Sequence, residues 1–155
     1  MWPAIFMKEV ILTGKVKEGL RIASGLNPGP TLKLNNTISK QKPFFIKAGV
    51  DEIQNCYDGT INLDISPYEF KIVKPDYEIT CEWSPGTIET FWLVKATIIF
   101  QEKTYNGYIY YPCPSPVKNH KDNIIELLAP KIENIKYNDH SVVEVSVDKV
   151  KIKKA

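Results

Sequence analysis

The chain has 155 residues, a length that fits one domain with one hydrophobic core, so we expect a single domain over residues 1–155. Hydrophobic residues make up 43% and charged residues 25% of it, which is ordinary for a globular protein and argues against disorder. The net charge of +2 and the single arginine, Arg21, argue against a protein that reads DNA bases, because base-edge recognition relies on arginine.

The residue mix favours strands over helices. The chain holds 19 Ile and 11 Val against 9 Leu and 6 Ala, and β-branched residues favour strands. Its 11 prolines and 8 glycines supply the turns that many short strands need. We therefore expect an all-β, or at least β-rich, domain.

Neither a membrane span nor a signal peptide is evident in the chain. No apolar run approaches the ~18–20 residues that a membrane-spanning helix needs, and the N-terminus lacks a basic region followed by a long apolar one. Cys56, Cys81 and Cys113 are odd in number and show no Cys-x-x-Cys spacing, so we expect reduced thiols in a cytoplasmic protein. Together with His120 and His140 they do not form a convincing zinc site.

The N-terminal part of the chain predicts one strand, a long loop and a short helix. Apolar residues alternate loosely over residues 5–16, which indicates a first strand. Residues 17–36 are rich in turn formers, and a long segment without periodicity is usually functional or mobile. A short helix is expected over residues 43–54, because Pro43 suits a first-turn position.

The middle of the chain predicts a series of strands. An Asp-Gly turn at residues 58–59 leads into a half-buried strand, in which apolar and polar residues alternate from Thr60 to Ile65. Two further hydrophobic segments, residues 70–73 and 77–83, are expected to form strands, and a Ser-Pro-Gly turn at residues 84–86 follows the second of them. The expected strands are residues 70–73, 77–83, 91–100 and 104–111, the last two as a hairpin.

The C-terminal part begins with a proline-rich loop at residues 112–116, where alternating prolines disfavour both a helix and strand pairing. Asp122 is placed to cap a short helix that runs to Leu128 and is stopped by Pro130. A closing strand is expected over residues 141–152, because valines alternate there with polar residues.

Two short motifs are more specific than the rest of the chain. One reads G-T-I-N-L at residues 59–63, and the other reads N-I-I-E-L-L-A-P at residues 123–130. In this order they resemble motifs of the archaeal CTP-dependent riboflavin kinases, which carry a G-T-L-N turn and later an I-I-E-I-I-A-P helix. The resemblance runs from about Gly14 to Val147, and N-D-H-S-V at residues 138–142 stands where the family has a D-G-D-x-V turn.

The resemblance implies a six-stranded cradle-loop β-barrel with one or two short helices. Such a protein moves the terminal phosphate of a nucleoside triphosphate, with CTP favoured, to the 5′-hydroxyl of riboflavin and makes FMN. The family holds Mg²⁺ with the Thr and Asn of the G-T-x-N turn, which match Thr60 and Asn62. Two residues apart on a strand, these side chains project to one face, and neutral oxygen ligands leave the ion's charge for the phosphates.

The resemblance also implies residues for the two substrates. Glu126 matches the family's flavin-contacting glutamate, and Ser115 falls at the hydroxyl position of its proline-started loop. The family's nucleotide loop reads G-x-G-E-G or G-x-G-E-A after the first strand, where this chain has G-L-R-I-A-S-G-L at residues 19–26. The nucleotide-binding residues expected here are Lys17, Gly19, Arg21, Ala23, Ser24, Gly25 and Lys131.

Two alternatives stay open at this point. Because the Gly-Glu-Gly core of the nucleotide loop is absent, the same barrel also suits a non-catalytic module that binds a flavin, a nucleotide or a protein. Thr60, Asn62 and Glu126 are then ordinary polar residues of a hairpin and a helix. The lysine-rich residues 149–154 suggest a nucleic-acid-binding barrel, but a solvated chain end explains them better, and we expect neither a nucleic-acid nor a membrane partner.

Overall fold

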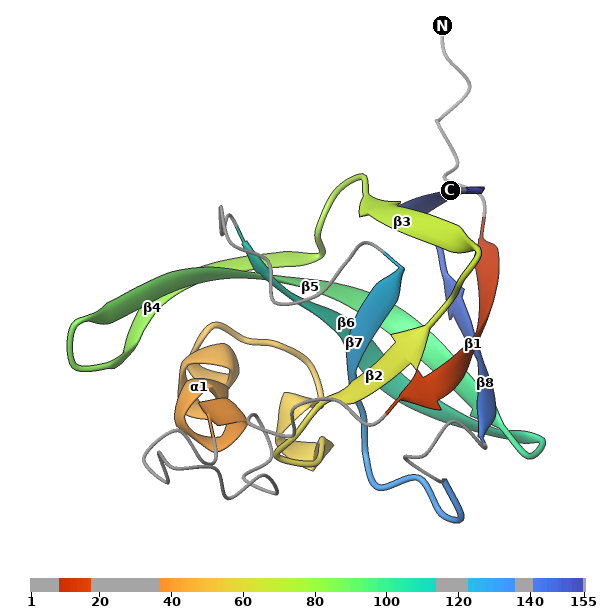
Figure 1. The fold of residues 1–155 in the computed structure, drawn as a ribbon. Coiled ribbons are helices and arrows are strands. Elements are labelled where there is room, and N and C mark those ends of the chain that lie inside the picture. The colour runs from red at the N-terminus through yellow and green to blue at the C-terminus, as the bar shows by residue number, and fades with distance from the viewer. Residues whose placement is uncertain (1–8, 18–36, 114–122, 136–140, 155) are drawn as a thin grey trace, which may run out of the picture.

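The structure, a computed structural model, describes residues 9–17, 37–113, 123–135 and 141–154 (Figure 1). Most of these residues lie in strands, which confirms the expected all-β class, and the two short helices agree with the expectation of one or two. The elements are β1 Val10–Lys17, α1 Thr37–Lys47, η2 Ile53–Asn55, β2 Ile61–Asp64, β3 Tyr68–Ile72, β4 Tyr77–Ser84, β5 Thr87–Phe100, β6 Lys103–Cys113, β7 Ile124–Leu128, β8 Val142–Val147 and β9 Val150–Lys154.

Six antiparallel strands close into a ring (Figure 1). Their order is β5-β6-β7-β2-β1-β8, and β8 closes the ring by pairing with β5, where Val145 lies opposite Ile98. β4 is added outside the ring along β5, and the two form a long hairpin that extends beyond it (Figure 1). β3 and β9 pair with each other in a separate two-stranded sheet that lies across one end of the ring (Figure 1).

Apolar side chains from alternate strand positions fill the ring. Val16 of β1, Leu63 of β2, Ile125 of β7 and Val145 of β8 are all fully buried in this core. The alternation follows from strand geometry, in which successive side chains point to opposite faces of a sheet. The outward-pointing residues of the same strands are therefore free to form a second layer or a site.

A second core lies outside the ring, between α1 and the outer face of β4, β5 and β6. Phe45 of α1 meets Phe91 of β5 edge-on, with ring centroids 5.3 Å apart, and Phe91 stacks on Tyr110 of β6 at 5.6 Å. Figure 1 shows α1 beside this part of the sheet. One portion of the ring's outer face is thus covered by a helix.

The helix expected over residues 43–54 lies earlier in the chain, as α1 Thr37–Lys47, and Pro43 is in its interior rather than in its first turn. The packing of one face explains the difference. Ile38, Gln41 and Phe45 follow the helical period and are all buried, so burial against the sheet stabilises a helix that the proline alone would interrupt.

The helix expected from Asp122 to Leu128 is wrong, because residues 124–128 form strand β7. β7 is hydrogen-bonded to β2 on one side and to β6 on the other. Ile125 and Leu127 point into the ring core, so the side chains follow the two-residue period of a strand. Asp122 itself lies outside the described residues.

The C-terminal end forms two strands, β8 and β9, where one closing strand was expected. Residues 151–154 are exposed, as expected of a solvated end, and they belong to a strand, since β9 pairs with β3 along its whole length. The proline-rich loop also begins later than expected, because Pro112 belongs to β6 and lies opposite Phe91. Residues 114–116 of that loop lie outside the described ranges.

The remaining predicted strands correspond to observed ones with shifted ends. Residues 70–73, 77–83, 91–100 and 104–111 match β3 to β6, and the part of residues 5–16 that the structure describes matches β1. Cys56 and Cys81 are free thiols, as expected, and burial raises the pKa of Cys56 to about 11. None of the helices in the described part of the chain has the length and apolar character that a membrane crossing requires.

Candidate functional site

β2 is a short central strand that presents polar side chains outward. It is paired with β1 on one side and with β7 on the other. Ile61 and Leu63 point into the ring core, so Asn62 and Asp64 face outward. The sequence predicted a polar face in contact with solvent, but Asn62 is only 7% exposed.

Four adjacent strands each place one polar side chain in a continuous row. Lys17 of β1 lies opposite Asn62 of β2. Asn62 lies opposite Glu126 of β7, and Glu126 lies opposite Tyr110 of β6. Directly opposite residues of antiparallel strands share one face, with Cβ atoms about 4.5–5.5 Å apart. We call Lys17, Asn62, Glu126 and Tyr110, with the adjoining Thr60, the polar row.

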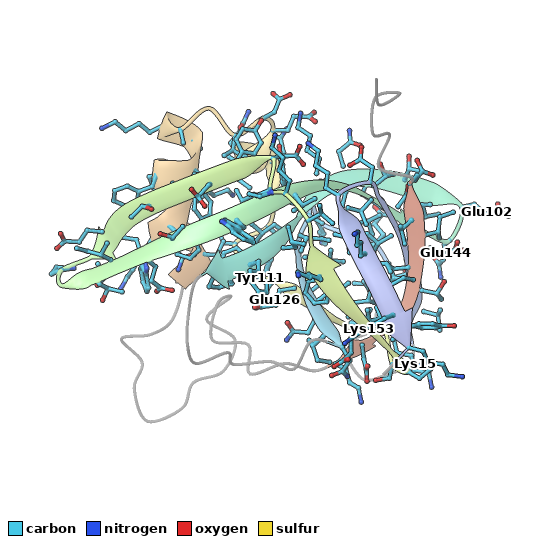
Figure 2. All side chains as sticks on the ribbon, turned by 90° about the horizontal axis from the view of Figure 1, so that it is seen from above. Lys15, Glu102, Tyr111, Glu126, Glu144 and Lys153 are labelled. Atoms are coloured by element: carbon cyan, nitrogen blue, oxygen red, sulfur yellow. The ribbon has the colours of Figure 1, made fainter. Side chains whose placement is uncertain are left out.

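Thr60 joins the polar row through a hydrogen bond. Its hydroxyl donates to Oε1 of Glu126, with 3.2 Å between the two oxygens. The two residues are 66 positions apart in the chain, so the pairing of β2 with β7 creates this contact. The sequence assigned Thr60 to a metal and Glu126 to a flavin, whereas the structure brings the two side chains together. Figure 2 shows Glu126 beside the end of β6 that carries Tyr111.

Asn62 contains a buried oxygen without a partner. Within the described structure, its Oδ1 atom accepts no hydrogen bond. Leaving a buried acceptor unsatisfied costs about 1–3 kcal/mol, and native proteins contain few such groups. Asn62 lies opposite Glu126, which accepts the Thr60 hydroxyl, so a donor or a cation bound beside these residues would satisfy the atom.

Asp64 is a site residue that the sequence analysis did not single out. Its Oδ1 accepts hydrogen bonds from the backbone N–H and hydroxyl of Ser66 and from the Asn123 amide, and Oδ2 lies 3.7 Å from Nζ of Lys17. Burial raises the pKa of this carboxyl, but the hydrogen bonds and Lys17 together outweigh burial, and the net shift is downward. Asp64 therefore places a negative charge next to Lys17 of the polar row.

Tyr110 and Gln41 were not assigned to the site by the sequence analysis. The Tyr110 hydroxyl donates to Oε1 of Gln41 on α1 at 2.6 Å, and both residues are buried. Burial first, and then the charge of Glu126, raise the pKa of Tyr110 well above its ordinary value of 10, so the phenol keeps its proton. The helical spacing of Gln41 with Phe45 and the strand alternation of Tyr110 were the available signals.

The other predicted site residues are not brought together by the described structure. Lys131 is exposed in the segment after β7, and among the described residues it forms no hydrogen bond or ion pair with Thr60, Asn62 or Glu126. The rest of the predicted set lies outside the described residues: Gly19, Arg21, Ala23, Ser24, Gly25 and Ser115.

A cleft of about 370 Å³ lies elsewhere, beside β5, β6 and the end of β8. Its lining includes the carboxylates of Glu9, Asp51, Glu52 and Asp148, with Lys95 as the one cation. A cleft with this excess of negative charge repels phosphate groups. It is therefore a poor site for a nucleotide, and none of the predicted site residues lines it.

The polar row fits Mg²⁺ through the chemistry of its donor atoms. The Thr60 hydroxyl, the Asn62 amide oxygen and the Glu126 carboxylate are hard oxygen ligands, which Mg²⁺ prefers. Within the described residues there is no group of three or more His, Cys, Asp and Glu side chains that would hold a metal ion. A cation at this site would therefore depend on the hydroxyl and amide oxygens as well as on a carboxylate.

Comparison with known proteins does not place the chain in a family. No protein-family model matches it, and no curated protein matches its sequence. The features of the chain that bear on its function are therefore the residues of the polar row and the two motifs that contain Thr60, Asn62 and Glu126.

Proposed function

We propose that the chain is a Mg²⁺-dependent phosphotransferase that makes FMN from riboflavin and a nucleoside triphosphate, with CTP as the favoured donor. The observation that carries the proposal is the unsatisfied Oδ1 of Asn62, buried next to the hydrogen-bonded pair of Thr60 and Glu126. The cost of this unpartnered acceptor is recovered when a cation binds. The two motifs that supply these residues are those that resemble the riboflavin kinases.

In the proposed reaction, the 5′-oxygen of riboflavin forms a bond to the terminal phosphorus as the bond from that phosphorus to the bridging oxygen breaks. The nucleoside diphosphate leaves with the electron pair of the broken bond, and the hydroxyl proton passes to solvent. Mg²⁺, when bound, supplies positive charge that neutralises the phosphates. Thr60 and Asn62 would hold the ion, and Lys17 adds a cation at the end of β1, from which residues 18–36 continue.

In this proposal Glu126 interacts with both Thr60 and riboflavin. Its Oε1 accepts the Thr60 hydroxyl, and a carboxylate has about four acceptor positions. It therefore retains capacity to accept hydrogen bonds from the ribityl hydroxyls or the ring N–H of riboflavin. Because Glu126 lies between Asn62 and Tyr110 in the sheet, riboflavin bound by Glu126 would lie beside the ion held by Thr60 and Asn62.

The second candidate function is a non-catalytic module that binds flavin or nucleotide on the same polar row. It is favoured by residues 19–26, which lack the Gly-Glu-Gly core of the family's nucleotide loop. Such a module needs the hydrogen-bonding groups of the polar row but no transfer of phosphate. The two functions therefore differ in turnover and not in flavin binding.

The test is a mass-spectrometric assay of FMN formation with riboflavin, Mg²⁺ and CTP, ATP, GTP or UTP in separate reactions. We expect FMN with one donor, and a loss of turnover of about a hundredfold or more in Thr60→Val and Asn62→Leu. Thr80→Val is the matched control, because Thr80 also forms a side-chain hydrogen bond, to Thr90, but lies on the β4–β5 hairpin. This variant should keep the wild-type rate.

Measurements of unfolding free energy distinguish a lost ligand contact from a loss of folding in these variants. Asn62→Leu removes the unsatisfied amide oxygen, so its free energy of unfolding without Mg²⁺ should be unchanged or higher by about 1 kcal/mol. Full turnover in folded Asn62→Leu would contradict the proposed site. If folded wild-type protein makes no FMN with any donor but binds riboflavin, the binding module is the correct function.

A further inference from the structure

The two-stranded sheet of β3 and β9 has one apolar face and one basic face. Phe70, Ile72 and Val150 alternate along one face and are buried in the ring core. The residues between them point the other way, and among these Lys71, Lys151 and Lys153 are exposed. With Lys74 just after β3, they form a surface that we call the basic ribbon. It is defined by Lys71, Lys74, Lys151 and Lys153.

The lysines of the basic ribbon repel one another, which lowers the stability of the folded protein. Lys71 lies directly opposite Lys151 in the sheet, and like charges at such positions are destabilising. Lys153 lies 4.0 Å from Glu69, with 79% of its side chain exposed, which makes this a weak surface pair. No other ion pair joins a lysine of the ribbon to a described residue.

Some lysines elsewhere in the described structure are paired with acids. Lys42 lies 2.9 Å from Asp58, and Lys149, which directly precedes β9, is paired with Asp76. Lys47, Lys95 and Lys131 also form no ion pair with a described residue, but they lie on separate parts of the fold. The lysines of the ribbon instead lie together where β3 and β9, two segments distant in the sequence, pair. A surface that keeps uncompensated charge in this way is complementary to a polyanion.

The spacing of the lysines suits an extended chain of phosphates. Residues two apart on a strand are about 6.8 Å apart, which applies to Lys151 and Lys153, and Lys71 adds a cation across the ladder. Lys74 adds a cation at the end of the ribbon where β3 ends and β9 begins, because the strands are antiparallel. The ribbon therefore offers a linear series of cations rather than a single anion site.

The chemistry of the ribbon favours nucleic acid over a membrane. Tyr68 and Ile152, the large exposed apolar side chains of these strands, are in register with Lys154 and Phe70 and so lie on the other face from Lys71 and Lys153. No large apolar side chain of β3 or β9 accompanies the lysines of the basic face, as insertion into a lipid interface would require. The ribbon also contains no arginine, which limits it to phosphate contacts.

We propose that the basic ribbon binds the phosphate backbone of nucleic acid without sequence specificity. This revises the expectation that residues 149–154 are a solvated end without a nucleic-acid partner, because the pairing of β9 with β3 adds Lys71 and Lys74 to the lysines of the tail. The proposal is independent of the polar row. It requires no ligand at Asn62 and no phosphotransferase activity.

The test is fluorescence anisotropy with two labelled DNA probes, a single strand of mixed sequence and a duplex, each about 20 nucleotides long. We expect affinity to fall steeply as salt rises, because each phosphate contact adds about 0.7–0.9 to the slope of log K against log salt. Lys71→Gln/Lys151→Gln should lose about tenfold or more in affinity at low salt, and its slope should fall by about 1–2.

The matched control is Lys47→Gln/Lys95→Gln, which makes the same change in net charge at two exposed lysines outside the ribbon. It should keep most of the wild-type affinity. The ribbon variant should fold normally, since it removes a like-charge pair, and its thermal midpoint should equal or exceed that of the wild type. Equal losses of affinity in both variants would overturn the proposal. Wild-type protein that binds neither DNA probe would also overturn it, as would protein that, in a parallel assay, binds only vesicles containing anionic lipid.

Discussion

At Asn62, the side chain that would best stabilise the fold differs from the one that a bound ligand would require. Its neighbours Ile61 and Leu63 serve the ring core, whereas its own side chain is buried on the opposite face with an unsatisfied oxygen. A leucine would fill this position without that cost. Local rules of this kind are most often broken at functional sites, so the choice of Asn supports a role in binding.

Asp64 makes the stability of the protein depend on pH. Its folded-state pKa lies below the ordinary value of 3.8. The stabilisation is therefore complete above the unfolded-state pKa and is lost as the pH falls through the folded-state pKa. We expect the free energy of unfolding of Asp64→Asn, measured with urea, to fall less than that of the wild type between about pH 5 and pH 2.

Ser66→Ala provides an intermediate case for the same measurement. It removes the hydroxyl that donates to Asp64 but keeps the backbone N–H of residue 66 and the Asn123 amide. Its pH profile should lie between those of the wild type and Asp64→Asn. Superimposable profiles for all three proteins would show that Asp64 has the same pKa in the folded and unfolded states.

The polar row shows how far single residues could be predicted from the sequence. Thr60 and Asn62 were paired correctly on one face, because their spacing on a strand decides this. The contact of Thr60 with Glu126 was not predictable, since it depends on the register of β2 with β7. Tyr110 and Gln41 were not assigned to the site, because a buried tyrosine and a helical glutamine have no distinctive pattern until α1 packs on β6.

At the scale of elements, β6 and β7 approach each other closely beside the polar row. A Cβ atom at Gly107 would lie 2.3 Å from the carbonyl oxygen of Leu128 and 2.9 Å from Cδ1 of Ile98. The backbone of β7 must move to relieve the first overlap. We expect Gly107→Ala to lower the free energy of unfolding by about 1–3 kcal/mol, measured by urea denaturation.

This substitution should also disturb the site, because β6 and β7 carry Tyr110 and Glu126 at opposed positions. The matched control is Asn106→Ala, at the exposed neighbouring position of the same strand. Its unfolding free energy should stay within about 0.5 kcal/mol of the wild type. A Gly107→Ala protein as stable as this control would show that the two strands separate easily.

The elements also show where sequence patterns are insufficient. Alternation over many residues predicted β5 and β6 well. The five residues 124–128 are too short a run to distinguish a buried strand from a helix by period alone, and the strands on either side of β7 come from distant parts of the chain. For α1, the sequence analysis placed Pro43 in the first turn, which the chemistry of proline favours. In the structure, burial of Phe45 and Ile38 determines where the helix begins and ends.

At the scale of the whole molecule, two cores stabilise different parts of the structure. The ring core is enclosed by six strands that close on themselves. The second core, which contains Phe45 and Phe91, holds α1 on the outer face of the sheet. The ring therefore has pairing that does not involve α1, whereas α1 packs on β4 and the η2 segment as well as on the outer face of the ring.

This arrangement predicts unequal effects of core substitutions. Phe45 is fully buried, so Phe45→Ala should cost about 3–5 kcal/mol in local or global stability. Because the closed ring keeps its own core, we expect hydrogen exchange in this variant to accelerate most in the amides of α1, with the amides of β1 and β8 retaining most of their protection. Release of α1 also removes Gln41 from Tyr110, so the riboflavin binding that we propose for the polar row should weaken.

Val145→Ala is the matched control within the ring, because Val145 is equally buried where β8 closes the ring against β5. Loss of packing there weakens the surface on which α1 rests. Exchange should therefore accelerate in β1, β8 and α1 together. The same uniform acceleration in Phe45→Ala would contradict the division into two cores, and it would mean that α1 and the ring unfold as one cooperative unit.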